Sequence, residues 1–106
     1  TLLAGACDAK ARLILFFPPD HMAIQARYRD GDAAGLETFK QTVRNAVAWH
    51  NGRCASKVAL FDFLNLNPLT TEALQHGRSA SYVDLVHFRP PAGLWLLGQM
   101  GFRPVP

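Results

Sequence analysis

The sequence has only two cysteines and no long apolar run, and both shortages exclude whole classes of protein. Cys7 and Cys54 are too few for a disulfide scaffold or a four-cysteine zinc site. We expect them to pack as small hydrophobic side chains. No apolar stretch approaches the roughly 20 residues that a membrane-spanning helix requires. The sequence therefore predicts no transmembrane segment.

A strong charge of one sign is also missing. The 11 basic and 8 acidic side chains leave a net charge of +3, and the basic residues are scattered along the chain. That excess is too small to indicate a nucleic-acid-binding surface, so we expect no nucleic acid as a partner. The 106 residues, 49% of them hydrophobic, have the composition of a single packed domain and not of a disordered chain. Because the chain starts at Thr1 without an initiator methionine or a signal peptide, we expect it to be cut from a longer protein.

Two short apolar runs predict strands. Residues 12–17 read Arg-Leu-Ile-Leu-Phe-Phe and stop at a Pro-Pro pair, which is typical of a strand buried on both faces. Residues 58–63 form a second run of this kind. A helix predicted over residues 32–51 separates them, with Asp32 as its N-cap and Asn51-Gly52 as its end. The pattern therefore predicts a βαβ unit with parallel strands and a right-handed crossover.

Three further segments have helical patterns. Residues 1–11 read as the end of one helix, residues 21–29 as a short helix broken at Asp30-Gly31, and residues 90–100 as a final helix that begins at two prolines. We expect an apolar stripe along the helix over residues 32–51, made of Leu36, Phe39, Val43, Val47 and His50. Its polar side is predicted to hold Glu37, Lys40, Gln41 and Arg44. The buried face of the final helix is predicted to be Leu94, Trp95 and Leu97.

These elements predict an α/β fold of the three-layer, parallel-sheet, flavodoxin-like kind, as one partial domain over residues 1–106. Two parallel strands are too few for a sheet that is covered on both faces. We therefore expect the fold to be incomplete on its own. The remaining strands would come from an absent N-terminal half or from a second copy of the chain.

An aspartate and a histidine stand out ahead of the final helix. Asp84 precedes His87 by three residues and follows an unusually long loop over residues 64–83. At this spacing Asp84 can accept a hydrogen bond from one ring nitrogen, which leaves the other nitrogen to act as a general base toward a hydroxyl group. The alternative is a structural pair, in which a capping aspartate lies beside a partly exposed histidine.

The segment Asp84-Leu85-Val86-His87, followed by Phe88-Arg89-Pro90 and a helix containing Gly93, resembles the last conserved block of SGNH/GDSL-type hydrolases and acyltransferases. The phrases at residues 15–21, 61–63 and 67–71 resemble the C-terminal half of uncharacterised bacterial SGNH-like proteins of the cell envelope. The resemblance implies that Asp84 and His87 are two members of a catalytic triad. It also implies an envelope or periplasmic location and an ester substrate on a carbohydrate.

This sequence departs from the family in lacking a recognisable nucleophile block. Its serines, Ser56, Ser79 and Ser81, lie in neither Gly-Asp-Ser nor Gly-x-Ser-x-Gly. We therefore expect the nucleophilic serine to lie outside this chain.

Asp62 is predicted to be a structural residue, whose carboxylate finds hydrogen-bond donors at the end of the second strand.

Several other side chains are weaker candidates. His21 and Arg89 are possible substrate-binding residues, although a solvated first-turn histidine and a surface arginine are the alternatives. His76, Asp84 and His87 do not match a metal-binding spacing, so we expect no metal and no cofactor. His50 is predicted to pack near a helix C-terminus. Trp49 and Trp95 are predicted to pack and not to bind sugars.

The sequence thus supports two functional hypotheses. In the first, the chain is the C-terminal part of an SGNH-like serine esterase or O-acyltransferase and is inactive alone. In the second, it is a non-catalytic binding or assembly module that dimerises through exposed sheet edges.

Overall fold

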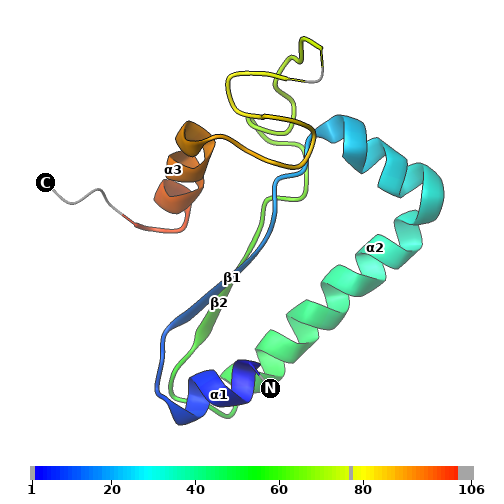
Figure 1. Ribbon diagram of the computed structural model, residues 1–106. Coiled ribbons are helices and arrows are strands. Elements are labelled where there is room, and N and C mark those ends of the chain that lie inside the picture. Colours follow the sequence, from blue (N-terminus) through cyan, green and yellow to red (C-terminus); the bar gives the residue numbers. More distant parts are fainter. Residues whose placement is uncertain (1, 77, 103–106) are drawn as a thin grey trace, which may run out of the picture. The chain divides into compact units, whose positions relative to one another are not determined.

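The computed structural model describes residues 2–76 and 78–102 and contains three helices and two strands in the described part of the chain (Figure 1). They follow in the order α1 (Leu2–Asp8), β1 (Leu13–Phe17), α2 (Met22–Asn51), β2 (Val58–Asp62) and α3 (Pro90–Gln99). The strands β1 and β2 are neighbours in one parallel two-stranded sheet. The predicted α/β class and the strand-helix-strand order are therefore confirmed.

The chain divides into two compact units. The strand unit consists of Thr1–Phe17 and Tyr28–Phe61, and the loop unit consists of Pro18–Arg27 and Asp62–Pro106. The strand unit contains α1, the sheet and most of α2, whereas the loop unit contains the long connection after β2 and helix α3. The Asp84–His87 pair belongs to the loop unit.

The strand β1 is less buried than its apolar run predicts. Phe17 is buried, but Leu13, Ile14 and Leu15 are half-buried and Phe16 is 41% exposed. The prediction of a strand buried on both faces is therefore wrong for the described residues. The physical reason is that burial on both faces requires helices packed on each face of the sheet. Among the described residues, the connection between β1 and β2 supplies a single helix, α2.

Helix α2 consists of two helical segments joined at Asp32, which has non-helical dihedral angles (φ −156°, ψ 76°). The Asp32 Oδ1 accepts a hydrogen bond of 2.8 Å from the Gly35 backbone N–H. This is the N-cap geometry that the sequence predicts for the second segment. The predicted break at Asp30-Gly31 is wrong by one to two residues, because the cap at Asp32 sets the junction.

Lys40 lies on the buried side of α2, against the predicted pattern. Val47 and His50 are buried as predicted, but Phe39 is 57% exposed and Lys40 is only 4% exposed. The Lys40 Nζ lies 5.8 Å from the centre of the Phe17 ring, and Phe39 packs edge-on against the same ring at 6.0 Å. The polar assignment of Lys40 is therefore wrong, since its apolar stem packs in the core while its ammonium group meets an aromatic face.

The two cysteines form a disulfide between α1 and the segment that follows α2. Cys7 and Cys54 are bonded, with their Cα atoms 5.9 Å apart. The expectation that they pack as free hydrophobic side chains is therefore wrong, although Cys54 is buried. Their separation of 47 residues in the sequence gives no sign that they meet. They are brought together because the chain crosses back over the sheet through α2.

Helix α3 buries a different face from the predicted one. Ala92, Leu96 and Met100, spaced by four residues, are buried, whereas Leu94 is 67% and Leu97 43% exposed. Trp95 is half-buried and meets Phe63 with 6.1 Å between ring centres. The predicted face is therefore wrong for both leucines. The helix is apolar on several sides, so hydrophobicity alone does not reveal which side packs.

Candidate functional site

The site is a small closed loop over residues 82–88 in the loop unit. Tyr82 and Phe88 form an antiparallel bridge, and the Val83 N–H donates to the His87 carbonyl at 2.8 Å. The Arg89 N–H donates to the Ser81 carbonyl at 2.7 Å, just before α3 begins. These bonds fix both ends of a short segment that carries Asp84 and His87 between them.

Asp84 and His87 contact each other directly within this loop. The His87 Nδ1 and the Asp84 Oδ2 lie 2.7 Å apart, and since a carboxylate only accepts, Nδ1–H is the donor. The Asp84 Oδ1 accepts from the Val86 and His87 backbone N–H groups, both at 2.8 Å. The side chains of His87 and Asp84 are 75% and 53% exposed. The predicted hydrogen bond is therefore confirmed, and it leaves the Nε2 side of an exposed ring available to a proton donor.

The hydrogen bonds to Asp84 also fix its charge. They lower the pKa of the Asp84 carboxyl from 3.8 to about 2, mainly through the Val86 N–H, then through the His87 side chain and the His87 N–H. The carboxylate is therefore ionised throughout the neutral range. An ionised acceptor holds the proton of the histidine on Nδ1, so that Nε2 is the basic nitrogen of the neutral ring.

Tyr82 anchors the loop to the segment that follows β1. Its side chain is fully buried, and its hydroxyl donates to the Pro19 carbonyl at 2.6 Å. Burial, with smaller effects of Glu72 and Asp20, raises the pKa of Tyr82 to about 12. The phenol is thus neutral and keeps its donated hydrogen bond. In addition, the His21 backbone N–H donates to the Leu85 carbonyl at 2.8 Å, inside the loop itself.

His21 is a buried structural residue in this arrangement. It is 2% exposed, its Nε2 lies 2.7 Å from the Glu72 carbonyl, and its Nδ1 accepts from the Ala23 N–H at 3.1 Å. The carbonyl requires a proton on Nε2, and the Ala23 amide requires an unprotonated Nδ1, so the geometry fits the neutral ring. The alternative of a solvated first-turn histidine is wrong. Its predicted substrate contact would require His21 to give up one of these bonds.

The serines nearest to His87 in sequence bind Glu72 instead. The Ser81 Oγ donates to the Glu72 Oε2 at 2.5 Å, and the Ser81 N–H donates to the Glu72 Oε1 at 3.0 Å. Hydrogen bonds from the Ser79 and Ser81 side chains lower the pKa of Glu72, the larger effect coming from Ser79. The Ser79 and Ser81 hydroxyl groups are therefore both engaged by the Glu72 carboxylate within the loop unit.

Arg89 is partly occupied by the same loop. Its Nε donates to the Ser79 carbonyl at 3.1 Å and to the Tyr82 carbonyl at 3.3 Å, and the side chain is half-buried. The residue is thus more than a surface arginine, because it ties residues 79–82 to the start of α3. These two bonds use only the Nε of Arg89. That the two terminal nitrogens of the guanidinium group contact substrate remains a prediction.

The rest of the long connection is also organised by side chains. The Asn67 Oδ1 accepts from the Leu69 and Thr70 N–H groups at 3.0 and 3.1 Å. The fully buried Thr70 donates from Oγ1 to the Asn65 carbonyl at 2.6 Å. Asp62, the last residue of β2, accepts from the Leu64 N–H at 2.9 Å, as its predicted structural role requires. The loop is therefore held by turns that a search for periodicity does not detect.

Sequence reasoning missed the two residues that hold the site in place, Glu72 and Tyr82. Glu72 is separated from Ser81 by nine residues, so no local spacing links them. Tyr82 could have been found from the sequence, because a large aromatic residue in a polar loop usually needs a buried position and a hydrogen-bond partner for its hydroxyl.

Within residues 2–76 and 78–102, no group of three or more histidines, cysteines or acids is placed to hold a metal ion. His76, Asp84 and His87 are among the residues searched and do not form such a group. No helix in the same part of the chain is long and apolar enough to cross a membrane.

Comparison with known proteins gives no match to this chain among family models, curated proteins or solved structures.

Proposed function

We propose that this chain supplies the aspartate and histidine of a catalytic triad in an SGNH-like serine esterase or O-acyltransferase. The three-layer, flavodoxin-like sheet of such an enzyme would be completed by polypeptide outside these residues, and so would the nucleophilic serine. The substrate class we propose is an ester on a carbohydrate of the bacterial cell envelope. The observation that carries the proposal is the 2.7 Å contact between His87 Nδ1 and Asp84 Oδ2 on an exposed ring.

In the proposed reaction His87 is the general base. Its Nε2 takes the proton from the serine hydroxyl as that oxygen attacks the ester carbonyl, and it returns the proton to the departing alcohol. Asp84 stays ionised throughout, because its pKa of about 2 lies far below neutral pH. Its role is to hold the ring in one tautomer and to stabilise the imidazolium that forms.

The surrounding contacts support this division of roles. Asp84 uses Oδ1 for two backbone amides and Oδ2 for the ring, so the backbone holds the carboxylate in position independently of the imidazole. Two hydrogen bonds also attach the loop to the segment after β1, one from the Tyr82 hydroxyl and one from the His21 backbone N–H. A base held by a fixed loop is poised for proton transfer without reorganising its partner.

The test uses the intact protein that contains this chain and a fluorophosphonate probe that labels activated serines. We expect labelling of a serine outside residues 1–106, loss of labelling in His87→Ala, and a fall in ester hydrolysis of about a thousandfold or more in Asp84→Asn. His76→Asn is the matched control, since His76 is an exposed histidine of the same connection and asparagine tolerates its positive φ of 54°.

The proposal fails if His87→Ala labels like the wild-type protein. Its second part, that the nucleophile lies elsewhere, is tested on the 106-residue chain alone. We expect no hydrolysis of p-nitrophenyl acetate above the buffer rate. Hydrolysis that disappears in His87→Ala would place the nucleophile within these residues.

The second candidate is a non-catalytic assembly module, and one feature of the pair favours it. The two backbone amides on Asp84 Oδ1 are those of a structural turn, which needs no catalytic role for the ring. In this reading an edge of the two-stranded sheet pairs with a second copy of the chain, and Phe16→Lys adds a charge to the edge strand β1. Sedimentation equilibrium distinguishes the two: a dimer that Phe16→Lys dissociates supports assembly, and a monomer at all concentrations contradicts it.

A further inference from the structure

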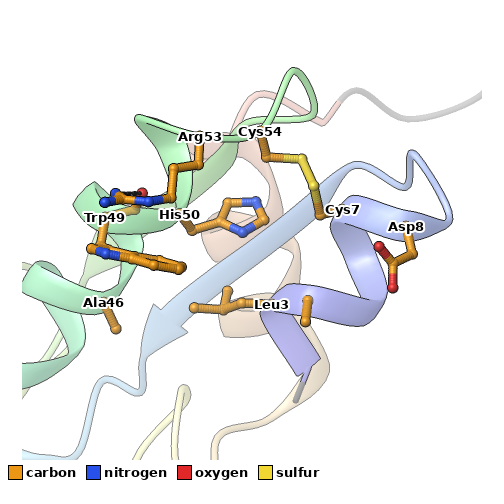
Figure 2. Close-up of a pocket in the computed structure, with 9 residues that line it drawn as sticks. Leu3, Cys7, Asp8, Ala46, Trp49, His50, Arg53 and Cys54 are labelled. Atoms are coloured by element: carbon orange, nitrogen blue, oxygen red, sulfur yellow. Dashed lines mark hydrogen bonds between the residues drawn. A yellow bond between two sulfur atoms is a disulfide. The ribbon is translucent and has the colours of Figure 1, made fainter.

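A pocket of about 470 Å³ lies in the strand unit, between α1 and the C-terminal part of α2 (Figure 2). Its volume is within the range of about 300–1,000 Å³ that is typical of small-molecule sites. The lining side chains are predominantly apolar or sulfur-containing, with three charged or ionisable groups among them. They are Leu3, Ala4, Cys7, Asp8, Ala46, Trp49, His50, Arg53 and Cys54. None of these residues takes part in the Asp84–His87 site.

The wall contributed by α2 carries an exposed aromatic platform. The sequence predicts that Trp49 packs, but it is 62% exposed and its packing partner is the Arg53 side chain. The guanidinium carbon of Arg53 lies 4.1 Å from the centre of the Trp49 ring, and its Nη1 donates to the Trp49 carbonyl at 3.3 Å. Figure 2 shows the guanidinium stacked over the indole, so the cation is held in one place and keeps other N–H groups for a ligand.

The charges of the pocket lie at opposite sides. Arg53 is next to Trp49, whereas Asp8 belongs to α1 on the far side in Figure 2. An anionic group on a ligand is therefore attracted to the Arg53 side and repelled from the Asp8 side. The Leu3, Ala4 and Ala46 side chains of the lining offer only apolar contact, and the His50 ring lies between Arg53 and Asp8 in Figure 2. This distribution distinguishes one end of a bound molecule from the other.

We propose that this pocket binds a planar hydrophobic anion, with its ring system against Trp49 and its acidic group on the guanidinium of Arg53. The aromatic face supplies stacking area, and Arg53 supplies a fixed, permanently charged fork for a carboxylate or sulfonate. The proposal is independent of the triad, since it concerns other residues in the other unit of the chain.

The disulfide makes this site dependent on oxidation. Four lining residues, Leu3, Ala4, Cys7 and Asp8, belong to α1, and no residue of α1 is buried. Seven residues without a buried side chain provide little packing to hold a helix in place. The Cys7–Cys54 bond is thus a covalent attachment of this wall, and we expect its reduction to loosen the α1 side of the pocket.

The test measures two fluorescent probes that share a planar body, anilinonaphthalene sulfonate and the uncharged phenylnaphthylamine, on the oxidised chain. We expect one molecule of the sulfonate to bind per chain. Trp49→Leu should weaken both probes by about tenfold, because both lose the stacking surface. Arg53→Gln should weaken the sulfonate by about tenfold and leave the neutral probe within about twofold.

Arg29→Gln is the matched control, since Arg29 is an exposed arginine of α2 outside the pocket lining. This variant should bind both probes like the wild-type chain. Reduction of the disulfide should weaken both probes. Because reduction also lowers stability, circular dichroism must show that each variant and the reduced chain keep their helices under the assay conditions. The proposal is overturned if Trp49→Leu binds the sulfonate like the wild-type chain, or if Arg53→Gln weakens the two probes equally.

Discussion

At the scale of single residues, Asp84 makes more of the hydrogen bonds that hold the site together than the His87 side chain does. Its two carboxylate oxygens accept three hydrogen bonds, two from backbone N–H groups and one from the imidazole. The backbone donors remain with any residue other than proline at position 87. The charge of Asp84 is therefore a property of the turn, and the histidine uses a carboxylate that is already in place.

We expect the pKa of Asp84 to be about 2, measured by carbon-detected NMR titration of the carboxyl group. His87→Ala should raise this pKa but leave it below 3.8, because the Val86 amide makes the largest contribution and is retained. The lowered pKa means that Asp84 stabilises the folded chain above about pH 3.8, and that this contribution is lost as the pH falls toward 2.

His76→Asn should leave the Asp84 titration unchanged, since His76 makes no hydrogen bond to it within the described residues. An Asp84 pKa in the ordinary range would mean that the turn does not persist in solution. Neither the local structure of the site nor the triad proposal would then stand.

At the scale of elements, the junction in α2 depends on a glycine that makes room for a cap. A Cβ atom added at Gly35 would collide with the Asp32 carboxylate that accepts the Gly35 N–H. At Gly31, by contrast, an added Cβ meets nothing within 4 Å. A methyl group is therefore obstructed at Gly35 and unobstructed at Gly31.

We expect Gly31→Ala to stabilise the chain by about 0.5–1 kcal/mol, because alanine loses less backbone entropy in a helix. Gly35→Ala should instead destabilise it, since the new methyl group displaces the Asp32 cap. Loss of the cap through Asp32→Ala should cost about 1 kcal/mol. The measurement is the free energy of unfolding from urea denaturation.

The double variant Asp32→Ala/Gly35→Ala is the internal check, because removing the carboxylate removes the collision. Gly35→Ala should be less harmful in that background than in the wild-type chain. If Gly31→Ala and Gly35→Ala give equal gains, Asp32 does not cap the second segment of α2 in solution.

At the scale of the whole molecule, the disulfide is the longest-range covalent constraint among the described residues. It closes a loop with a sequence separation of 47 residues that contains both strand β1 and helix α2. Such a cross-link stabilises a fold chiefly by restricting the unfolded chain. A loop of this length corresponds to about 4 kcal/mol in the chain-entropy treatment, which is an upper figure for most proteins.

We therefore expect Cys7→Ser/Cys54→Ser to lower the free energy of unfolding by about 2–4 kcal/mol in urea denaturation. The single variant Cys7→Ser should lose a similar amount, since either change opens the loop. Ser56→Ala is the control for a small polar change in the same region of the chain. A double variant as stable as the wild-type chain would contradict the assignment of the disulfide as a main constraint.

The sequence by itself determined the elements and the site contact. The apolar runs at residues 12–17 and 58–63 correspond to β1 and β2, the prolines and Gly101 bracket α3, and Asp32 caps the second segment of α2. The Asp84–His87 hydrogen bond was also predictable, because three residues in a turn bring the two side chains together. All of these signals act between near neighbours in the chain, where spacing and side-chain chemistry are sufficient.

Only the tertiary structure decided the partners that lie far apart in the sequence. It joined Cys7 to Cys54, buried Lys40 against Phe17 and tied Tyr82 to Pro19 across 63 positions. In the tertiary structure Ala92 and Leu96 are on the buried face of α3, whereas Leu94 is exposed. Contacts of this kind depend on how the chain returns on itself. They also depend on which of several apolar faces finds a surface to cover it, and local periodicity contains neither piece of information.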